Sequence, residues 1–267
     1  MINANELVGE SHIVFITLDT LRYDVAQELF HQGALPNLQH YLPASGWELR
    51  HTPGSFTYAA HQAFFAGFFP TPAKAGKHPR LFAARFEGSE TTQQTTYTFD
   101  TPDIVSGLRQ KGYHTICIGG VGFFNKRTPL SRVFPDMFHE SHWEETFGVT
   151  DPESTKHQFQ RAVHCLEALP DQQRFFLFIN VSAIHQPNYF YLDPEKKEDN
   201  LASHAAALKY VDSQLPILTD YLKTKGKTLC ILCADHGTTY GENGYQGHRL
   251  AHPKVWEVPY LETVINQ

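Results

Sequence analysis

The sequence is poor in the residues that mark several classes of protein. Its 267 residues include only four cysteines, two methionines and three tryptophans. Basic residues number 22 against 28 acidic ones, a net charge of −6, which disfavours a nucleic-acid binder that works through a basic surface. No apolar run approaches the roughly 20 residues that a membrane-spanning helix needs. The first eleven residues are polar and lack the pattern of a signal peptide, so we expect a soluble, cytoplasmic protein with no membrane partner.

The cysteines show no disulfide framework. Cys117, Cys230 and Cys233 lie in strand-like apolar runs. Cys230 and Cys233 have the spacing of a redox motif, but residues three apart in a strand point to opposite faces. Buried thiols are therefore favoured over a redox or zinc motif, and free thiols are typical of a reducing compartment.

Histidine, by contrast, is abundant, with 16 in 267 residues or about 6% of the chain. Apolar residues make up 41% and charged residues 19%, a balance that supports a large core and excludes a disordered chain. A histidine-rich, weakly acidic globular chain directs attention first to a metal site.

Short apolar runs alternate with helix-like stretches along the chain. We expect buried strands over residues 12–18, 114–118, 174–181 and 228–234, and helices over 24–32, 58–68, 153–169 and 201–223. A further helix is predicted to begin at Thr101-Pro102-Asp103. This alternation predicts an α/β fold, a three-layer α/β/α sandwich with a largely parallel central sheet. We expect one domain over residues 1–267, with loop insertions around 70–100 and 123–150.

Three predicted strands end on side chains that can bind a metal. Asp19 follows the first, His185 follows the third, and Asp235, His236 and then His248 follow the fourth. Each residue alone has a plainer interpretation, as a turn former or a packed histidine. Together they predict one site, because ligands bind beyond the carboxyl ends of strands in open α/β sheets. Carboxylates and imidazoles without a thiol suit Zn²⁺, Mn²⁺ or Mg²⁺.

This ordered set resembles the alkaline phosphatase superfamily, in particular its sulfatase-like branch and the phosphoethanolamine transferases. The matching segments are Asp19-Thr20-Leu21-Arg22, His185-x-Pro187-x-Tyr189, and Asp235-His236-Gly237 followed by Gly241-Glu242-Asn243-Gly244 and His248. The resemblance covers residues 12–67 and 175–260, and it implies an alkaline phosphatase-like sandwich.

The resemblance also implies a nucleophile at a helix N-terminus. In sulfatases it lies ten residues before a glycine, and counting back from Gly67 gives Thr57. Thr57 would begin the helix predicted from Tyr58, so that terminal N–H groups face a phosphoryl group. A threonine hydroxyl is a weak nucleophile until a metal lowers its pKa. Two alternatives stay open: Thr57 as a plain N-cap, and Ser55 as the reactive hydroxyl.

The roles that the resemblance implies can be assigned residue by residue. Asp19, Asp235 and His236 would hold a divalent ion, Zn²⁺ or Mn²⁺ with Mg²⁺ as the alternative, and the Thr57 oxygen would be a fourth ligand. His185 and His248 would complete a site for a second ion or bind substrate oxygens, and His185 is also the candidate acid. The candidate substrate-binding residues are His61, for which packing is the alternative, Tyr189 and Arg22.

Two departures from the sulfatase pattern bear on the activity. Thr20 stands where sulfatases carry a second aspartate, and Thr57 is not the modifiable cysteine or serine of those enzymes. We therefore expect a metal-dependent phosphatase or phosphodiesterase that acts on a small phosphorylated molecule through a phospho-threonine intermediate. The alternatives are a sulfuric-ester hydrolase acting on a sulfated molecule, a phospho-group transferase, and a catalytically degenerate module that binds a metal or a partner.

Overall fold

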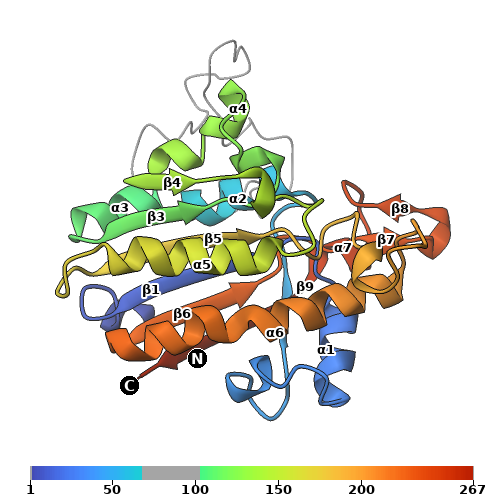
Figure 1. Ribbon diagram of the computed structural model, residues 1–267, viewed down its shortest axis with the longest axis horizontal. Coiled ribbons are helices and arrows are strands. Elements are labelled where there is room, and N and C mark those ends of the chain that lie inside the picture. Colours follow the sequence, from blue (N-terminus) through green and yellow to red (C-terminus); the bar gives the residue numbers. More distant parts are fainter. Residues whose placement is uncertain (1, 68–102, 267) are drawn as a thin grey trace, which may run out of the picture.

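A seven-stranded sheet forms the centre of the molecule (Figure 1). The computed structural model describes residues 2–67 and 103–266, so the predicted insertion at 70–100 and the predicted helix start at Thr101 and Pro102 lie outside the described residues. The strand order is β2-β9-β6-β1-β5-β3-β4. The strands are β1 (His12–Leu18), β2 (Glu48–His51), β3 (His114–Ile118), β4 (Glu140–His142), β5 (Phe175–Val181), β6 (Thr228–Cys233) and β9 (Glu257–Ile265).

The five strands from β6 to β4 run parallel, whereas β9 pairs antiparallel with both β6 and β2. The apolar, partly β-branched sequences of β6, β1, β5 and β3 explain their central place, since strands of a parallel sheet are buried on both faces. All seven residues of β5 are buried. The sheet confirms the predicted α/β class with a mostly parallel centre.

Helices cover both faces of the sheet and produce two cores. In β5, Phe175, Leu177 and Ile179 join one core, while Phe176 and Phe178 join the other, because successive side chains of a strand point to opposite faces. The helices are α1 (Tyr23–His31), α2 (Thr57–Ala66), α3 (Ile104–Gln110), α4 (Pro129–Arg132), α5 (Ser154–Glu167), α6 (Leu201–Lys225) and α7 (Pro253–Trp256). Residues of α1, α5 and α6 pack in the first core, and residues of α2 and α3 in the second. The three predicted layers are thus present.

Shorter elements fill the connections. A two-stranded sheet pairs β7 (Thr239–Tyr240) with β8 (Gln246–Gly247). The 3₁₀ turns are η1 (Ala4–Glu6), η2 (Leu38–His40), η3 (Gly122–Phe124), η4 (Pro135–Met137), η5 (Glu145–Phe147), η6 (Tyr189–Tyr191) and η7 (Glu242–Gly244). The segment 123–150, predicted as irregular loop, therefore differs from expectation, since it holds α4, β4 and two of these turns. None of the helices in the described ranges is long and apolar enough to cross a membrane.

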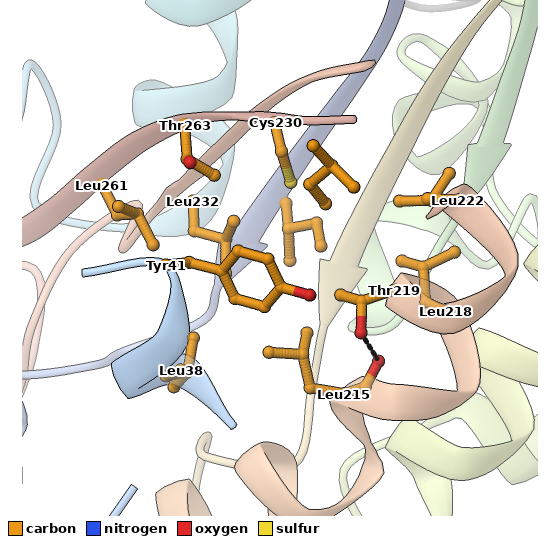
Figure 2. A pocket seen from close by; sticks show the side chains of 12 residues that line it. Leu38, Tyr41, Leu215, Leu218, Thr219, Leu222, Cys230, Leu232, Leu261 and Thr263 are labelled. Atoms are coloured by element: carbon orange, nitrogen blue, oxygen red, sulfur yellow. Dashed lines mark hydrogen bonds between the residues drawn. The ribbon is translucent and has the colours of Figure 1, made fainter. Parts of the chain in front are cut away.

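All four cysteines are free and buried, which confirms the buried-thiol prediction. Cys230 lines a narrow pocket between α6 and the sheet (Figure 2). The lining side chains are almost all apolar, and the Thr219 hydroxyl donates to the Leu215 carbonyl oxygen at 3.2 Å. This pocket offers a substrate no charged group, and we regard it as a packing gap.

Candidate active site

The carboxyl ends of three neighbouring parallel strands bring the predicted metal ligands together. Asp19 follows β1, His185 lies beyond β5, and Asp235 and His236 follow β6. The side chains of Asp19, Asp235 and His236 are fully buried. One donor atom of each lies within 4.8 Å of the others, so these three form a group that can hold a metal ion.

In each aspartate, one carboxylate oxygen accepts hydrogen bonds from protein groups and the other carboxylate oxygen has no partner. The amide of Asn180 donates to Asp19 Oδ2 at 3.1 Å, and the backbone N–H groups of Thr20 and His236 donate to Asp235 Oδ1 at 3.3 and 3.0 Å. The buried atoms Asp19 Oδ1 and Asp235 Oδ2 have no hydrogen-bond partner. Burial and the neighbouring carboxylate raise the pKa of Asp19, and burial raises the pKa of Asp235. Two buried carboxylates with unpaired oxygens fit a bound cation, which would offset the desolvation cost.

The histidines are oriented so that a ring nitrogen remains for a ligand. The Nδ1–H of His236 donates to the Gly237 carbonyl oxygen at 2.8 Å, and that of His185 donates to the Gln186 carbonyl oxygen at 2.5 Å. A neutral imidazole that donates through Nδ1 presents a lone pair at Nε2, the arrangement typical of metal-binding histidines. His236 Nε2 lies 3.8 Å from Asp19 Oδ1 and 3.6 Å from Asp235 Oδ2.

His248 joins this group from the loop after β8. Its ring centroid lies 4.5 Å from that of His236 and 5.6 Å from that of His185. Its Nδ1 is buried and has no hydrogen-bond partner. Burial, together with His236, His185 and Arg249, lowers the pKa of His248 to about 3, so the ring is neutral and available as a ligand.

Glycine is required at position 237 for this arrangement. A Cβ atom there would lie 2.0 Å from the Lys254 carbonyl oxygen, far inside any allowed contact. The Gly237 N–H donates to the Val255 carbonyl oxygen at 2.7 Å. The Asp-His-Gly motif therefore combines two candidate ligands with a glycine that lets the backbone of α7 approach closely.

Thr57 is the first residue of α2 and points at the carboxylates. Its hydroxyl lies 3.4 Å from Asp19 Oδ2 and 3.4 Å from His236 Nε2. Phe56, not Thr57, occupies the N-cap position, so the plain N-cap interpretation of Thr57 was wrong. Ser55, the alternative hydroxyl, is only half-buried, and its carbonyl oxygen accepts from the Arg249 N–H at 2.8 Å.

Of the three residues predicted to bind substrate, His61 and Arg22 are already bonded to other protein groups, whereas Tyr189 is half-buried. Both nitrogens of the buried His61 ring are used, since Nδ1 donates to the Thr57 carbonyl oxygen at 2.7 Å and Nε2 accepts from the Thr17 hydroxyl at 3.0 Å. Burial lowers the pKa of His61 to about 3. The buried guanidinium of Arg22 pairs with Asp24 at 2.7 Å and with Glu242. Tyr189 lies half-buried in η6, where its N–H donates to Asp199 Oδ1 at 2.8 Å.

Sequence reasoning missed the residues that hold the ligands in place. Asn180 donates to Asp19 and accepts from the Val121 N–H at 3.0 Å. The Thr52 hydroxyl donates to the Asp235 carbonyl oxygen at 2.5 Å. Thr20 adopts a left-handed conformation with φ of 65° and has a buried hydroxyl without a partner. An asparagine inside the apolar run of β5 was the one visible signal, because a buried amide needs partners.

The comparisons with known proteins bear on the fold and the family. One structural neighbour is the C-terminal periplasmic domain of the phosphoethanolamine transferase EptC from Campylobacter jejuni, which is 13% identical with a TM-score of 0.64 over 95% of this chain and 79% of that one. A second is the corresponding domain of EcEptC from Escherichia coli in complex with Zn, which is 12% identical with a TM-score of 0.64 over 94% and 72%.

A third is a protein of the alkaline phosphatase superfamily from Vibrio parahaemolyticus, which is 20% identical with a TM-score of 0.60 over 95% of this chain and 60% of that one. These likenesses show the fold, and they confirm the alkaline phosphatase-like sandwich. A sequence comparison with the curated proteins gives no match. The family model described as Sulfatase matches residues 11–262. The chain therefore belongs to the Sulfatase family.

Proposed function

We propose that this protein cleaves esters of phosphate with Thr57 as the nucleophile, in a reaction that depends on a divalent ion. The observation that carries the proposal is the position of the Thr57 hydroxyl, 3.4 Å from both Asp19 and His236 and beside two unpaired carboxylate oxygens. The hydroxyl is thus within reach both of the atoms that would hold the ion and of a substrate bound to that ion.

Asp19, Asp235, His236 and the Thr57 oxygen would hold the ion, and Zn²⁺ or Mn²⁺ suits these donors, with Mg²⁺ as the alternative. When bound, it would lower the pKa of the threonine hydroxyl and neutralise charge on the substrate oxygens. His185 and His248 offer imidazole nitrogens nearby, so they would hold a second ion or bind substrate oxygens.

The start of α2 is suited to bind a phosphoryl group attached to Thr57. No side chain caps this ten-residue helix, so no side-chain acceptor takes the N–H groups of its first turn. Such N–H groups, with the positive end of the helix dipole, favour an anion. A phosphoryl group attached to Thr57 would lie next to them.

The reaction divides into two displacements at phosphorus. In the first, the bond from Thr57 Oγ1 to phosphorus forms, the bond to the leaving oxygen breaks, and the threonine proton passes towards Asp19 Oδ2. In the arrangement in which His185 holds no second ion, its ring would carry a proton at Nε2 as well and would give this Nε2 proton to the leaving oxygen. In the second, the oxygen of water bonds to phosphorus, the bond from phosphorus to Thr57 Oγ1 breaks, Asp19 returns the proton to Oγ1, and a proton of the water passes to His185.

His61 and Arg22 act in this proposal by positioning. His61 fixes the first turn of α2 through the Thr57 carbonyl, and Arg22 fixes the loop after β1 to Glu242. Tyr189 remains the candidate contact to the substrate, a small phosphorylated molecule.

Transfer to an acceptor other than water is the second candidate, since two of the neighbours are domains of EptC enzymes and one of these is named a phosphoethanolamine transferase. Sulfate-ester hydrolysis fits less well, because Thr57 replaces the modifiable residue. A degenerate binding module is the alternative from another class.

The test compares Thr57→Ala, Thr57→Ser and the control Ser55→Ala on panels of phosphate monoesters, phosphodiesters and sulfate esters. We expect T57A to keep its metal but to lose turnover by about 10⁴-fold or more, with partial activity in T57S and near-normal activity in S55A. An active T57A protein would overturn the nucleophile assignment. A wild-type protein that binds metal but cleaves no ester on these panels would favour the binding module.

We further propose a cytoplasmic location, supported by four free, buried thiols. Fractionation of cells that express the protein tests this, and recovery outside the cytoplasm, as for the neighbours named periplasmic domains, would overturn it.

A further inference from the structure

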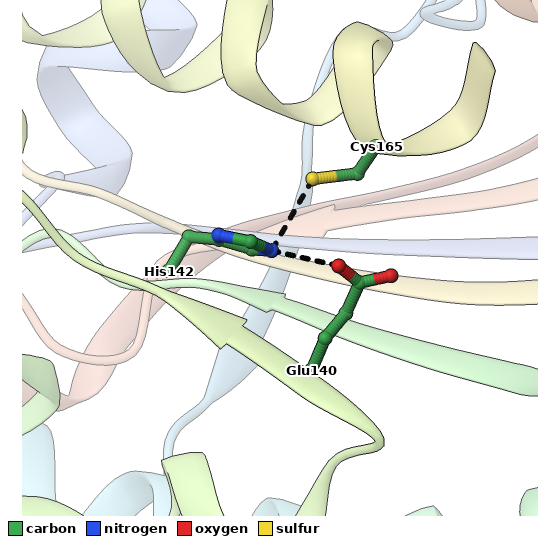
Figure 3. A group of neighbouring side chains, drawn as sticks. All are labelled: Glu140, His142 and Cys165. Carbon is green, nitrogen blue, oxygen red and sulfur yellow. Dashed lines mark hydrogen bonds and ion pairs between the residues drawn. The ribbon is translucent and has the colours of Figure 1, made fainter. Parts of the chain in front are cut away.

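A second group of metal-binding side chains lies at the β4 edge of the sheet, and it shares no residue with the active site. Glu140 and His142 come from β4, and Cys165 comes from α5 (Figure 3). A carboxylate oxygen, an imidazole nitrogen and the thiol sulfur lie within 4.8 Å of one another. His114, at the start of β3, contacts the same carboxylate.

The sheet register explains why these side chains meet. Glu140 pairs with Ile116 and His142 with Ile118, and both isoleucines pack in the core on the α5 side. Because residues two apart in a strand share a face, Glu140 and His142 both point towards α5. Cys165 lies near the end of α5, only 5% exposed, and faces them.

The distances are close to those of a ligand set. His142 Nε2 lies 2.8 Å from Glu140 Oε2 and 3.3 Å from Cys165 Sγ. Around tetrahedral zinc, with bonds of about 2.0–2.3 Å, neighbouring donors stand about 3.3–3.6 Å apart. The two pairs that include His142 would thus need to separate by about half an ångström or less to admit the ion, and the carboxylate and the sulfur lie within 4.8 Å of each other.

We propose that Glu140, His142 and Cys165 form a second metal site, selective for a thiophilic divalent cation such as Zn²⁺. Thiolate and imidazole donors favour zinc over magnesium, calcium and manganese. On binding, the S–H bond of Cys165 breaks, a sulfur–metal bond forms, and the proton goes to solvent. His142, whose Nε2–H donates to Glu140 Oε2 at 2.8 Å without the ion, gives up that proton to solvent, takes one at Nδ1 and binds the ion through the Nε2 lone pair.

Charge and access fit this occupant. The thiolate and the carboxylate would balance the two positive charges of the ion. His114 Nε2, 2.8 Å from Glu140 Oε1, positions the carboxylate from its other side. The side chains of His114, Glu140 and His142 are 30%, 33% and 25% exposed, so solvent reaches the site.

Neither a reactive thiol nor a simple ion pair fits the whole cluster. Burial and the Glu140 charge raise the pKa of Cys165 to about 11, so a free reactive thiolate is disfavoured. An ion pair of Glu140 with its two histidines explains the carboxylate but not the thiol beside His142. A bound ion explains all three donors, and it would fasten the three-residue edge strand β4 to α5.

Cobalt and zinc binding to the untagged protein test the proposal, because the active-site ligands include no thiol. We expect Co²⁺ to give a thiolate charge-transfer band in the near ultraviolet in the wild type. The band should persist in Asp235→Ala and in the matched control Cys230→Ala, which also removes a buried thiol, and should vanish in Cys165→Ala. Bound Zn²⁺ should fall by one equivalent in C165A, and His142→Gln should bind zinc at this site at least about tenfold more weakly.

The absence of the band from the wild type, or its persistence in C165A, would overturn the proposal. Equal zinc content in C165A and C230A would also overturn it, and the cluster would then be only an ion pair beside a thiol that binds no metal. If C165A does not fold, H142Q provides the test, because His142 is partly exposed. Zinc affinity at this site equal to that of the wild type would then overturn the proposal.

Discussion

At the scale of single residues, the active site is a set of buried atoms that lack partners. Asp19 Oδ1, Asp235 Oδ2 and His248 Nδ1 are all buried without a hydrogen bond. Such atoms are costly in a folded protein, and each is expected to have a reason. Here one cation would satisfy the carboxylates and reduce their mutual repulsion.

Replacing Asp235 with asparagine should therefore stabilise the metal-free protein while abolishing metal binding. The neutral side chain removes one of two buried like charges, and each kcal/mol gained raises the melting temperature by about 2–4 °C in a chain of this size. Melting curves with and without EDTA measure both effects. A D235N protein that melts below the metal-free wild type would contradict this account.

Asn180 should matter for catalysis although it touches no substrate. Asn180→Ala removes the donor that orients Asp19 and leaves the Val121 N–H unpaired. We expect a 10–100-fold loss of metal affinity or activity, about the size typical of groups that support metal ligands. Titration with Mn²⁺ separates affinity from turnover, and unchanged values for both would show that Asp19 is held without it.

The sequence predicted that the candidate ligands would lie together, but not which residues would hold them in place. Asp19, Asp235 and His236 were found because each directly follows an apolar strand. The partners of Arg22 and His61 were not, because Glu242 and Thr17 lie 220 and 44 residues away in the chain. Contacts of that kind arise only from tertiary packing.

At the scale of elements, the strongly patterned segments were predictable and the short ones were not. Strand β1 has the predicted bounds, and α5 and α6 lie within two residues of theirs. Strand β4 has three residues and no apolar run, so its sequence carries no periodic signal. It forms because β3 offers an unpaired edge.

Helix α6 carries a buried histidine that links three segments of the site. His204 Nε2 accepts from the Arg22 N–H at 3.3 Å, and Nδ1 donates to the Tyr240 hydroxyl at 3.0 Å. A proton on Nε2 would face an N–H donor. Burial, together with the charge of Arg22, lowers the pKa of His204 to about 3.

This histidine should make stability fall in mild acid. Between its unfolded pKa of about 6.5 and its folded value, the unfolded chain binds one more proton, so unfolding becomes easier as pH falls. The contribution of His204 approaches about 1.4 kcal/mol per pH unit in that window. Urea unfolding of wild type and His204→Gln from pH 7 to 4 measures it. We expect a weaker pH dependence in H204Q, and parallel curves would contradict the assignment.

At the scale of the whole molecule, metal binding and folding should be coupled. The candidate donors come from the ends of β1 and β6 and from α2, which are far apart in sequence, so an ion there would tie α2 to the centre of the sheet. A ligand at 100 times its Kd stabilises the folded state by about 2.7 kcal/mol.

Mn²⁺ should therefore raise the melting temperature of the metal-free wild type by about 5–10 °C. Manganese is the probe because it disfavours the thiol-containing cluster of Glu140, His142 and Cys165. Differential scanning fluorimetry measures the shift, and Asp19→Asn serves as the control without response. An equal shift in D19N would place the ion elsewhere.

The loop between β6 and β9 has a consequence for how such enzymes diverge. It leaves the sheet after Cys233 and returns at Glu257, and its two ends are hydrogen-bonded neighbours, with Ala234 N–H donating to the Pro259 carbonyl oxygen at 3.1 Å. The excursion is thus closed at its base like a β-hairpin. Residues can be gained or lost in this excursion without shifting the register of the central sheet, provided that Glu242 and His248 keep their places. The surroundings of the site can therefore vary in shape while Asp235 and His236, at the closed base, stay where they are.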